Sequence, residues 1–166
     1  MSNFITLQLD TDIDLLSTLV EQCKDYFLLL DGYLPDEAGI LQLFKDVPPN
    51  HPLEGLSIYG LLEEDQLLGA IWCYRGYPKE KDAYIGLLLV AENQRKKGIG
   101  TQLYQFVEKV LKQDSFQRIQ LAVLRDNESA CLFWKKLGFQ LFKEHPARQL
   151  GDKWHELLEF EKRIDL

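Results

Sequence analysis

The chain has 166 residues and a formal net charge of −7, with 46% hydrophobic and 27% charged residues. This length suits one hydrophobic core, so we expect residues 1–166 to form a single domain. The acidic balance argues against a nucleic-acid partner, and no apolar run approaches the roughly 20 residues of a membrane span. The first ten residues lack the basic and apolar regions of a secretory signal, which favours a soluble cytoplasmic protein.

The three cysteines give no sign of a metal or redox site. Cys23, Cys73 and Cys131 are odd in number, widely spaced and set within apolar segments. Such spacing does not match a metal-ligand pattern. We therefore expect buried, reduced thiols and no bound metal.

The N-terminal part of the chain predicts one strand followed by two helices. Ile5, Leu7 and Leu9 alternate with polar residues, as in a half-buried strand. Thr11, with an acidic residue three positions later, resembles a capping box, and apolar residues then recur at helical spacing over residues 16–27. The Asp31-Gly32 pair ends that helix, and Pro35-Asp36-Glu37 begins a second, shorter one.

The rest of the chain predicts a hairpin and then a β-α-β unit. The apolar run Ala83–Val90 reads as a strand covered on both faces. Further expected elements are strands at 57–62, 67–74, 118–124, 139–142 and 154–160, and helices at 103–111 and after Asn127. We expect an α/β fold with a central mixed sheet of about seven strands, flanked on both faces by about four helices.

A loop with two glycines separates the central strand from the following helix. In Arg95–Thr101, Gly98 and Gly100 allow the backbone to approach a ligand, and the helix N-terminus that follows attracts anions. Three cations adjoin it, so the segment predicts a phosphate site. Thr101 stands where a P-loop has lysine, and Leu103 stands where a dinucleotide fingerprint has glycine or alanine, so both of those motifs fit poorly.

A second motif follows one strand later. Asn127 is followed by Ala130 three residues on, and the helix that they begin ends in Gly138-Phe139. Together with Arg95–Thr101, this motif resembles the GNAT superfamily of N-acetyltransferases. The first segment is similar to its pyrophosphate-binding signature and the second to its Asn-x-x-Ala helix. The motifs cover about Tyr84–Phe139, while the order of elements is similar over nearly the whole chain.

The resemblance implies acetyl-CoA as cosubstrate and no metal. The pyrophosphate would lie on the loop, and the pantetheine arm would add alongside the central strand. The acetyl carbonyl would meet a backbone amide near Val90, which would act as an oxyanion donor. The residues that this assigns to the cofactor are Leu88, Leu89, Val90, Arg95, Lys96, Lys97, Gly98, Ile99, Gly100, Thr101, Asn127 and Trp134.

The acid and base of the transfer depart from the pattern of the superfamily. Many members place a glutamate where this chain has Tyr84, and a tyrosine where it has Trp134. We consider Tyr84, Asp82 and Glu156 as catalytic candidates. Asp82 shares a strand face with Tyr84, and Glu156 lies on the apolar face of the last strand, where burial would raise its pKa. A solvated edge position is the competing interpretation of Glu156, and the three histidines read as surface or packing residues.

The acceptor is expected to be an amine-bearing small molecule or peptide. The first two helices and the turn before the central strand would form its pocket, and a homodimer is one assembly that we consider. Polar candidates for this pocket are Asp25, Tyr26, Asp31, Arg75 and Tyr77.

Two other functions compete with an active acetyltransferase. The first is a GNAT-like module that holds acyl-CoA as a sensor without turnover, which the departures at Tyr84 and Trp134 motivate. The second is a dinucleotide-dependent oxidoreductase, which Leu103 and the order of elements disfavour.

Overall fold

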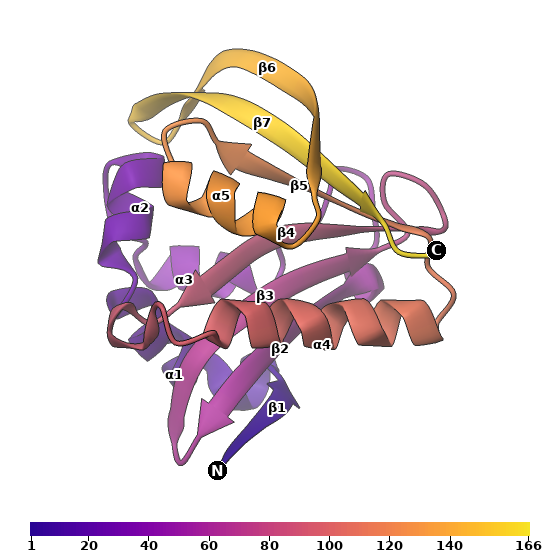
Figure 1. Cartoon of the computed structure of the whole chain (residues 1–166). Helices are drawn as coiled ribbons and strands as arrows, with labels where there is room; N and C mark the ends of the chain where they lie inside the picture. The colour runs from indigo at the N-terminus through magenta and orange to yellow at the C-terminus, as the bar shows by residue number, and fades with distance from the viewer.

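One mixed sheet organises the chain in the computed structural model, which describes residues 1–166. Its seven strands are ordered β1-β2-β3-β4-β5-β7-β6, and five α-helices surround them (Figure 1). The predicted sheet is confirmed, with one more helix than expected. The strands are β1 (Ser2–Thr6), β2 (Leu56–Glu63), β3 (Gln66–Arg75), β4 (Asp82–Val90), β5 (Arg118–Leu124), β6 (Gln140–Leu150) and β7 (Lys153–Arg163). The helices are α1 (Leu9–Glu21), α2 (Lys24–Asp31), α3 (Glu37–Leu43), α4 (Ile99–Gln113) and α5 (Glu128–Lys136).

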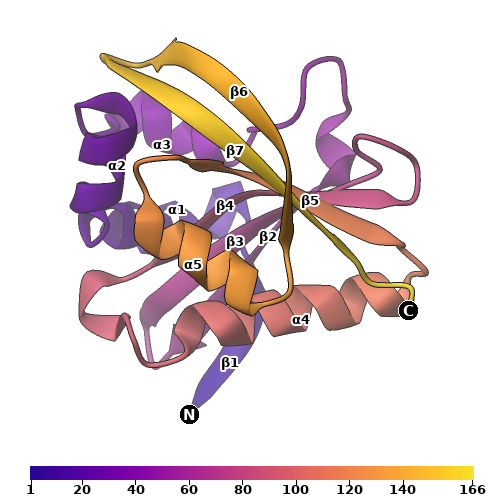
Figure 2. The same cartoon turned by 45° about the horizontal axis from the view of Figure 1, so that its top comes forward.

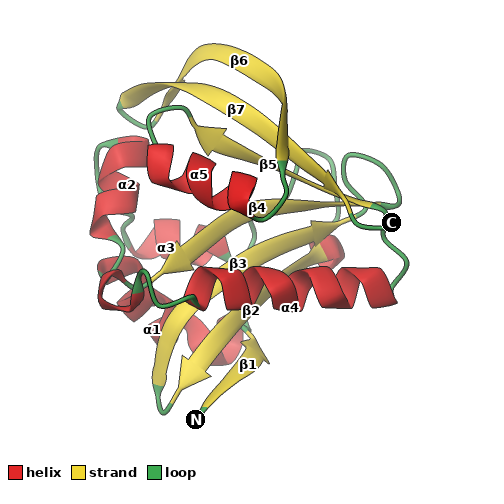
Figure 3. Cartoon of the chain, viewed as in Figure 1, coloured by secondary structure: helices red, strands yellow, loops and turns green.

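The two faces of the sheet carry separate hydrophobic cores. Helices α4 and α5 lie on one face and α1 and α3 on the other (Figures 1 and 3). Leu103 and Val107 of α4 pack against the first face, and Leu16 and Leu19 of α1 pack against the second. These residues are the apolar stripes that the helical spacing predicted. None of the helices combines the length and hydropathy that a membrane crossing requires.

The single helix expected over residues 16–27 is wrong, because the chain bends at Cys23. That residue has non-helical dihedral angles (φ −120°, ψ 30°), and its thiol donates to the Val90 carbonyl at 3.3 Å. The bend lets α1 and α2 each place an apolar side against the sheet. Gln8 rather than Thr11 is the N-cap of α1, because its backbone is still extended (φ −121°, ψ 136°). Its side chain makes no capping hydrogen bond, but its amide donates to the Asp12 carboxylate at 2.7 Å.

The sheet forks at its centre. Parallel pairing between β4 and β5 stops at Ile85 and Leu121, beyond which β4 pairs with β3 and β5 pairs with β7. Gly86 forms a bulge in β4, because its neighbours Ile85 and Leu87 face consecutive residues of β3. Gly86 and Ala122 are consequently exposed, although they lie on central strands. The expectation that Ala83–Val90 is covered on both faces holds for most of the strand, since Leu88 and Val90 pack in one core and Leu89 in the other, whereas Gly86 is exposed at the bulge.

The C-terminal hairpin is longer than the sequence predicted. Strands β6 and β7 run eleven residues each, and β6 is irregular at two places along its pairing with β7. The hairpin arches over the sheet, and its tip reaches the end of α2 (Figure 2). There the Asp152 amide donates to the Asp31 carbonyl at 2.8 Å. This contact closes one side of the fork.

Candidate active site at the fork

The loop after β4 presents free backbone amides. None of the amides from Lys96 to Thr101 donates a hydrogen bond within the protein, and the first helical bond of α4 runs from the Gln102 amide to the Gly98 carbonyl. Lys96 and Gly98 have left-handed backbone conformations, with φ of 62° and 82°. Both helices α4 and α5 begin at the end of the molecule where β4 and β5 end (Figure 1, left). Amides and a helix N-terminus arranged in this way can bind a phosphate group.

Arg95 is already engaged by the protein. Its guanidinium forms two hydrogen bonds with the Asp25 carboxylate, one of them 2.9 Å long, and its Nε donates to the Val90 carbonyl at 3.2 Å. The hydrogen bond from Arg95 lowers the pKa of Asp25 below its usual value. The structure thus pairs a residue predicted for the cofactor with one predicted for the acceptor. Exposed Lys96 and Lys97 are the cations left free beside the loop.

The free edge of β4 and the start of α5 carry other residues that the sequence assigned to the cofactor. Beyond Ile85, β4 has a strand partner on its β3 side alone. Leu88 and Val90 pack toward α4 and α5, whereas Leu89 packs toward the opposite core. The Asn127 carboxamide oxygen accepts from the Ala130 amide at 3.2 Å, which confirms the predicted helix cap.

Trp134, which the sequence assigned to the cofactor site, lies in the hydrophobic core. Its ring meets those of Tyr104 and Phe139 edge to face, with centroids 5.7 and 5.2 Å apart, and the residue is buried. Phe133, which the sequence placed on the apolar face of this helix but did not assign to the site, occupies the contact between α4 and α5. A Cβ atom added at Gly100 would lie 3.2 Å from the Phe133 ring, so this glycine permits the close approach of the two helices.

Tyr84 faces the other side of the sheet, toward the α1–α3 layer and the C-terminal hairpin. Its ring packs edge to face on Tyr77 at 5.4 Å, and Tyr77 packs in the same way on His51 at 5.1 Å. Burial, reinforced by the charge of Glu159, raises the pKa of Tyr84 to about 12. The phenol therefore stays protonated near neutral pH and can donate a hydrogen bond.

The two carboxylates predicted as catalytic candidates are bound by arginines. Asp82 is buried at the closed end of the fork, where its Oδ2 lies 2.6 Å from Arg118 Nη2. Glu156 is exposed and pairs with Arg125, so the apolar surroundings expected for it are wrong. Glu156 is solvated, as the competing interpretation expected, although its strand β7 lies between β5 and β6 and not at the edge of the sheet. Glu159, on the opposite face of the same strand, was not singled out by the sequence.

The predicted acceptor residues do not all converge. Tyr26 and Asp31 lie on α2, and burial raises the pKa of Tyr26 to about 12 and that of Asp31 above its usual value. Arg75 instead lies on the α4 face, where it donates to Ser57 Oγ at 2.8 Å and to the Tyr59 hydroxyl at 2.7 Å. The sheet separates it from Tyr77, which corrects its placement in the acceptor pocket.

The cysteines are buried, as predicted, and the structure contains no group of three or more His, Cys, Asp or Glu side chains placed to hold a metal ion. Burial raises the pKa of the Cys23 and Cys73 thiols to about 11 and raises that of Cys131 as well. All three therefore stay protonated near neutral pH, which makes them poor nucleophiles.

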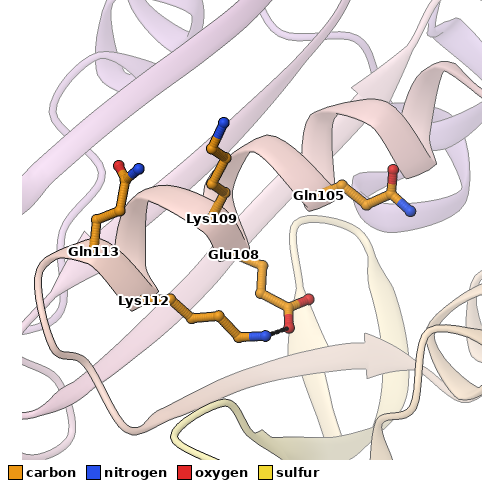
Figure 4. Close-up of a pocket in the computed structure, with 5 residues that line it drawn as sticks. All are labelled: Gln105, Glu108, Lys109, Lys112 and Gln113. Atoms are coloured by element: carbon orange, nitrogen blue, oxygen red, sulfur yellow. Dashed lines mark ion pairs between the residues drawn. The ribbon is translucent and has the colours of Figure 1, made fainter.

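A surface hollow lies elsewhere, along the outer side of α4 (Figure 4). Lys112 Nζ pairs there with Glu108 Oε1 at 2.9 Å, and no apolar side chain lines the hollow. It lacks the free backbone amides of the loop Lys96–Thr101. Its lining residues are Gln105, Glu108, Lys109, Lys112 and Gln113.

Comparison with known sequences identifies relatives of this chain. A profile of the acetyltransferase (GNAT) family matches residues 17–139, which is more than half of the chain. The chain is 28% identical over 127 residues to the uncharacterized N-acetyltransferase YobR of Bacillus subtilis, covering 75% of this chain and 47% of that protein. It is 35% identical over 86 residues to N-alpha-acetyltransferase 30 of Schizosaccharomyces pombe, covering 49% of this chain and 56% of the relative. The chain thus spans about half the length of these curated relatives.

Solved structures share the fold. An acetyltransferase from Thermus thermophilus superposes with a TM-score of 0.79 at 22% identity, covering 98% of this chain and 97% of the other. The ribosomal-protein-S18-alanine N-acetyltransferase from Escherichia coli superposes with a TM-score of 0.72 at 13% identity, covering 100% of this chain and 96% of the other. These likenesses confirm the predicted architecture.

Proposed function

Because the chain belongs to the acetyltransferase (GNAT) family, we propose that it transfers the acetyl group of acetyl-CoA directly to an amine. Residues 1–166 would act as a single domain, with the cofactor on one side of the fork and the acceptor on the other. The transfer needs no metal and no covalent enzyme intermediate, since protonated thiols at Cys23, Cys73 and Cys131 would not take the acetyl group.

The fork beside a loop of free amides is the observation that carries this proposal. A pantetheine arm is an extended chain with amide groups, and it suits the unpaired edge of β4 beyond Ile85. Its pyrophosphate suits the free amides from Lys96 to Thr101, with Lys96 and Lys97 beside it. A backbone amide near Val90 would then polarise the thioester carbonyl.

The acceptor would approach from the face that carries Tyr84 and Tyr77. Only a neutral amine can attack a thioester, and an alkyl ammonium group has a pKa of about 10.4, so a proton must leave the nitrogen. The name of one relative is N-alpha-acetyltransferase, and that of one protein of similar fold describes acetylation of an alanine of ribosomal protein S18. Peptides with a free α-amino group are therefore the first acceptors to test, followed by small amines.

The test is release of the CoA thiol from acetyl-CoA in the presence of a panel of amines. The panel contains an alanine-initiated tetrapeptide amide, the same peptide N-acetylated as a control, a lysine peptide and a polyamine. We expect sustained release with at least one free amine and none with the acetylated peptide. Tight acetyl-CoA binding in calorimetry with no release from any amine would instead identify an acyl-CoA sensor.

A further inference from the structure

A hydrogen-bonded carboxylate and imidazole lie on the acceptor face, apart from the residues assigned to the cofactor and the acceptor. His145 Nε2 of β6 donates to Glu159 Oε1 of β7 at 2.8 Å. Both side chains are partly open to solvent, at 31% and 26% of their surface. A carboxylate held in one orientation by a neighbouring group is the usual arrangement of a catalytic base.

The pairing of the strands places Glu159 on the same face as Tyr84. Tyr84 pairs with Gln120 of β5, which pairs in turn with Glu161 of β7. The Gln120 carboxamide also donates to the Glu161 carboxylate at 3.2 Å. Since side chains alternate along a strand, Glu159, two residues before Glu161, lies on this face as well.

The position of Glu159 along β7 brings it to the open part of the fork. It pairs with Ala122 of β5, one residue beyond Leu121, which is the last β5 residue paired with β4. Ala122 is exposed and its side chain is small, so it leaves the space in front of Glu159 open. The charge of Glu159 also acts on the Tyr84 phenol, which supports their proximity.

Other groups around this pair are consistent with a held carboxylate. Lys143 stands opposite Glu159 in the β6–β7 pairing, and Arg148 of β6 lies near enough to Tyr84 to oppose the rise in its pKa. His145 lies between the two irregularities of β6, so its place depends on this local distortion. In this register the imidazole reaches Glu159.

We propose that Glu159 is the general base of the acetyl transfer and that His145 is the residue that positions it. This assignment rests on the proposed function. As the neutral amine nitrogen attacks the thioester carbon and the C–N bond forms, one N–H proton passes to the Glu159 carboxylate. The C–S bond breaks with its electron pair on sulfur, and the proton passes from Glu159 through solvent to that thiolate. The products are an N-substituted acetamide and the CoA thiol.

A matched pair of carboxylate variants tests the assignment, with the alanine-initiated peptide and the rest of the amine panel as acceptors. Glu159→Ala is expected to lower kcat by about 100-fold, the usual contribution of a general base, with the KM for acetyl-CoA unchanged. Added formate should restore part of that loss, because it replaces the carboxylate. Glu144→Ala is the control, since Glu144 is an exposed β6 residue paired with Arg125. It should keep kcat within about twofold and show no response to formate.

His145→Asn is expected to lower kcat by about tenfold through loss of the hydrogen bond that orients Glu159, with acetyl-CoA affinity unchanged. The melting temperature of each variant shows whether a loss of activity comes from misfolding or from the missing catalytic group. Glu159→Gln replaces Glu159→Ala if the alanine variant does not fold. If the wild type is active and Glu159→Ala or Glu159→Gln retains more than a third of its kcat, Glu159 is not the base. A loss of kcat in Glu159→Ala without formate rescue likewise contradicts the assignment. A wild type silent with every amine would overturn the proposed function and this assignment with it.

Discussion

The two sides of the fork are built by different means. The side that we propose for the cofactor consists of backbone groups from one continuous stretch, the end of β4 and the loop Lys96–Thr101. The side that we propose for the acceptor consists of side chains from distant segments, among them Tyr77, Tyr84 and Glu159. Backbone groups recognise what every acyl-CoA shares, whereas side chains can change without altering the fold. A family can therefore keep one cosubstrate and vary its acceptors.

Gly98→Val is the sharpest test of the loop Lys96–Thr101 as a binding site for acetyl-CoA. Gly98 has φ of 82°, and a Cβ atom added there would meet no heavy atom within 4 Å, so the substitution strains the loop without a clash. A left-handed conformation costs a β-branched residue about 1–2 kcal/mol, so acetyl-CoA should bind roughly 5- to 30-fold more weakly. Calorimetry measures the dissociation constant.

Gly76→Val is the matched control for this prediction. Gly76 has φ of 85° and open surroundings, but it lies in the turn between β3 and β4, away from the loop. It should lose stability comparably and keep its affinity for acetyl-CoA. Equal affinities of wild type and Gly98→Val would refute the backbone cradle.

Tyr84→Phe tests the side of the fork that we propose for the acceptor. Losing the phenol removes one hydrogen-bond donor from the acceptor face, which should lower kcat/KM by about tenfold. Since the pKa of Tyr84 is about 12, the loss should be constant from about pH 6 to about pH 9, where the phenol stays protonated. A loss that varies with pH over this range would show that the phenol itself titrates during turnover.

Trp134→Phe should act on stability more than on turnover. Trp134 is packed among Tyr104, Phe133 and Phe139, so a smaller ring leaves a cavity that costs about 1–3 kcal/mol of the free energy of unfolding. We expect kcat/KM to stay within about tenfold, because an indole N–H cannot act as a general acid. A collapse of activity with fold and acetyl-CoA binding intact would show that the indole serves the chemistry.

The smallest expected effect concerns Asp25 of α2, which forms an ion pair with Arg95 at the start of the loop Arg95–Thr101. Its pKa is lowered in the folded state, so the ion pair contributes stability above the unfolded pKa of about 3.9 and loses it as pH falls through the lower, folded pKa. Asp25 is largely exposed, so Asn substitution should cost at most about 0.5 kcal/mol at neutral pH, and this difference should vanish in acid. Urea unfolding at several pH values measures this difference in stability. The control is Asp14→Asn, because Asp14 is exposed and forms no ion pair.

The sequence predicted the features that depend on local chemistry. The loop Arg95–Thr101 and the Asn127 cap follow from residues adjacent in the chain, and the structure places both at helix starts. Alternation along β7 separated two faces, but the sequence pointed to Glu156 and not to Glu159, because the pattern does not say which face meets the fork. That depends on packing between strands more than 30 residues apart in the chain, which no local pattern encodes.

The break between α1 and α2 shows the same limit. Apolar spacing continues through Cys23, so the pattern predicted a single helix. The break accompanies a bond from the Cys23 thiol to the Val90 carbonyl, 67 positions away. Arg95 donates to the same carbonyl, so one backbone oxygen joins the bend, the end of β4 and the loop.

The fork also sets how the centre of the sheet exchanges hydrogen with solvent. Amides of a central strand usually exchange slowly, because successive amides donate alternately to the two neighbouring strands. In β4 the amides that point toward β5 should lose this protection after Ile85, where the β5 partner ends, while those that point toward β3 keep it. Deuterium should therefore enter the β5-facing amides of the second half far faster than the other amides of the strand, and a bound pantetheine chain should slow it. The exchange rate of these amides would then show whether a ligand lies between β4 and β5.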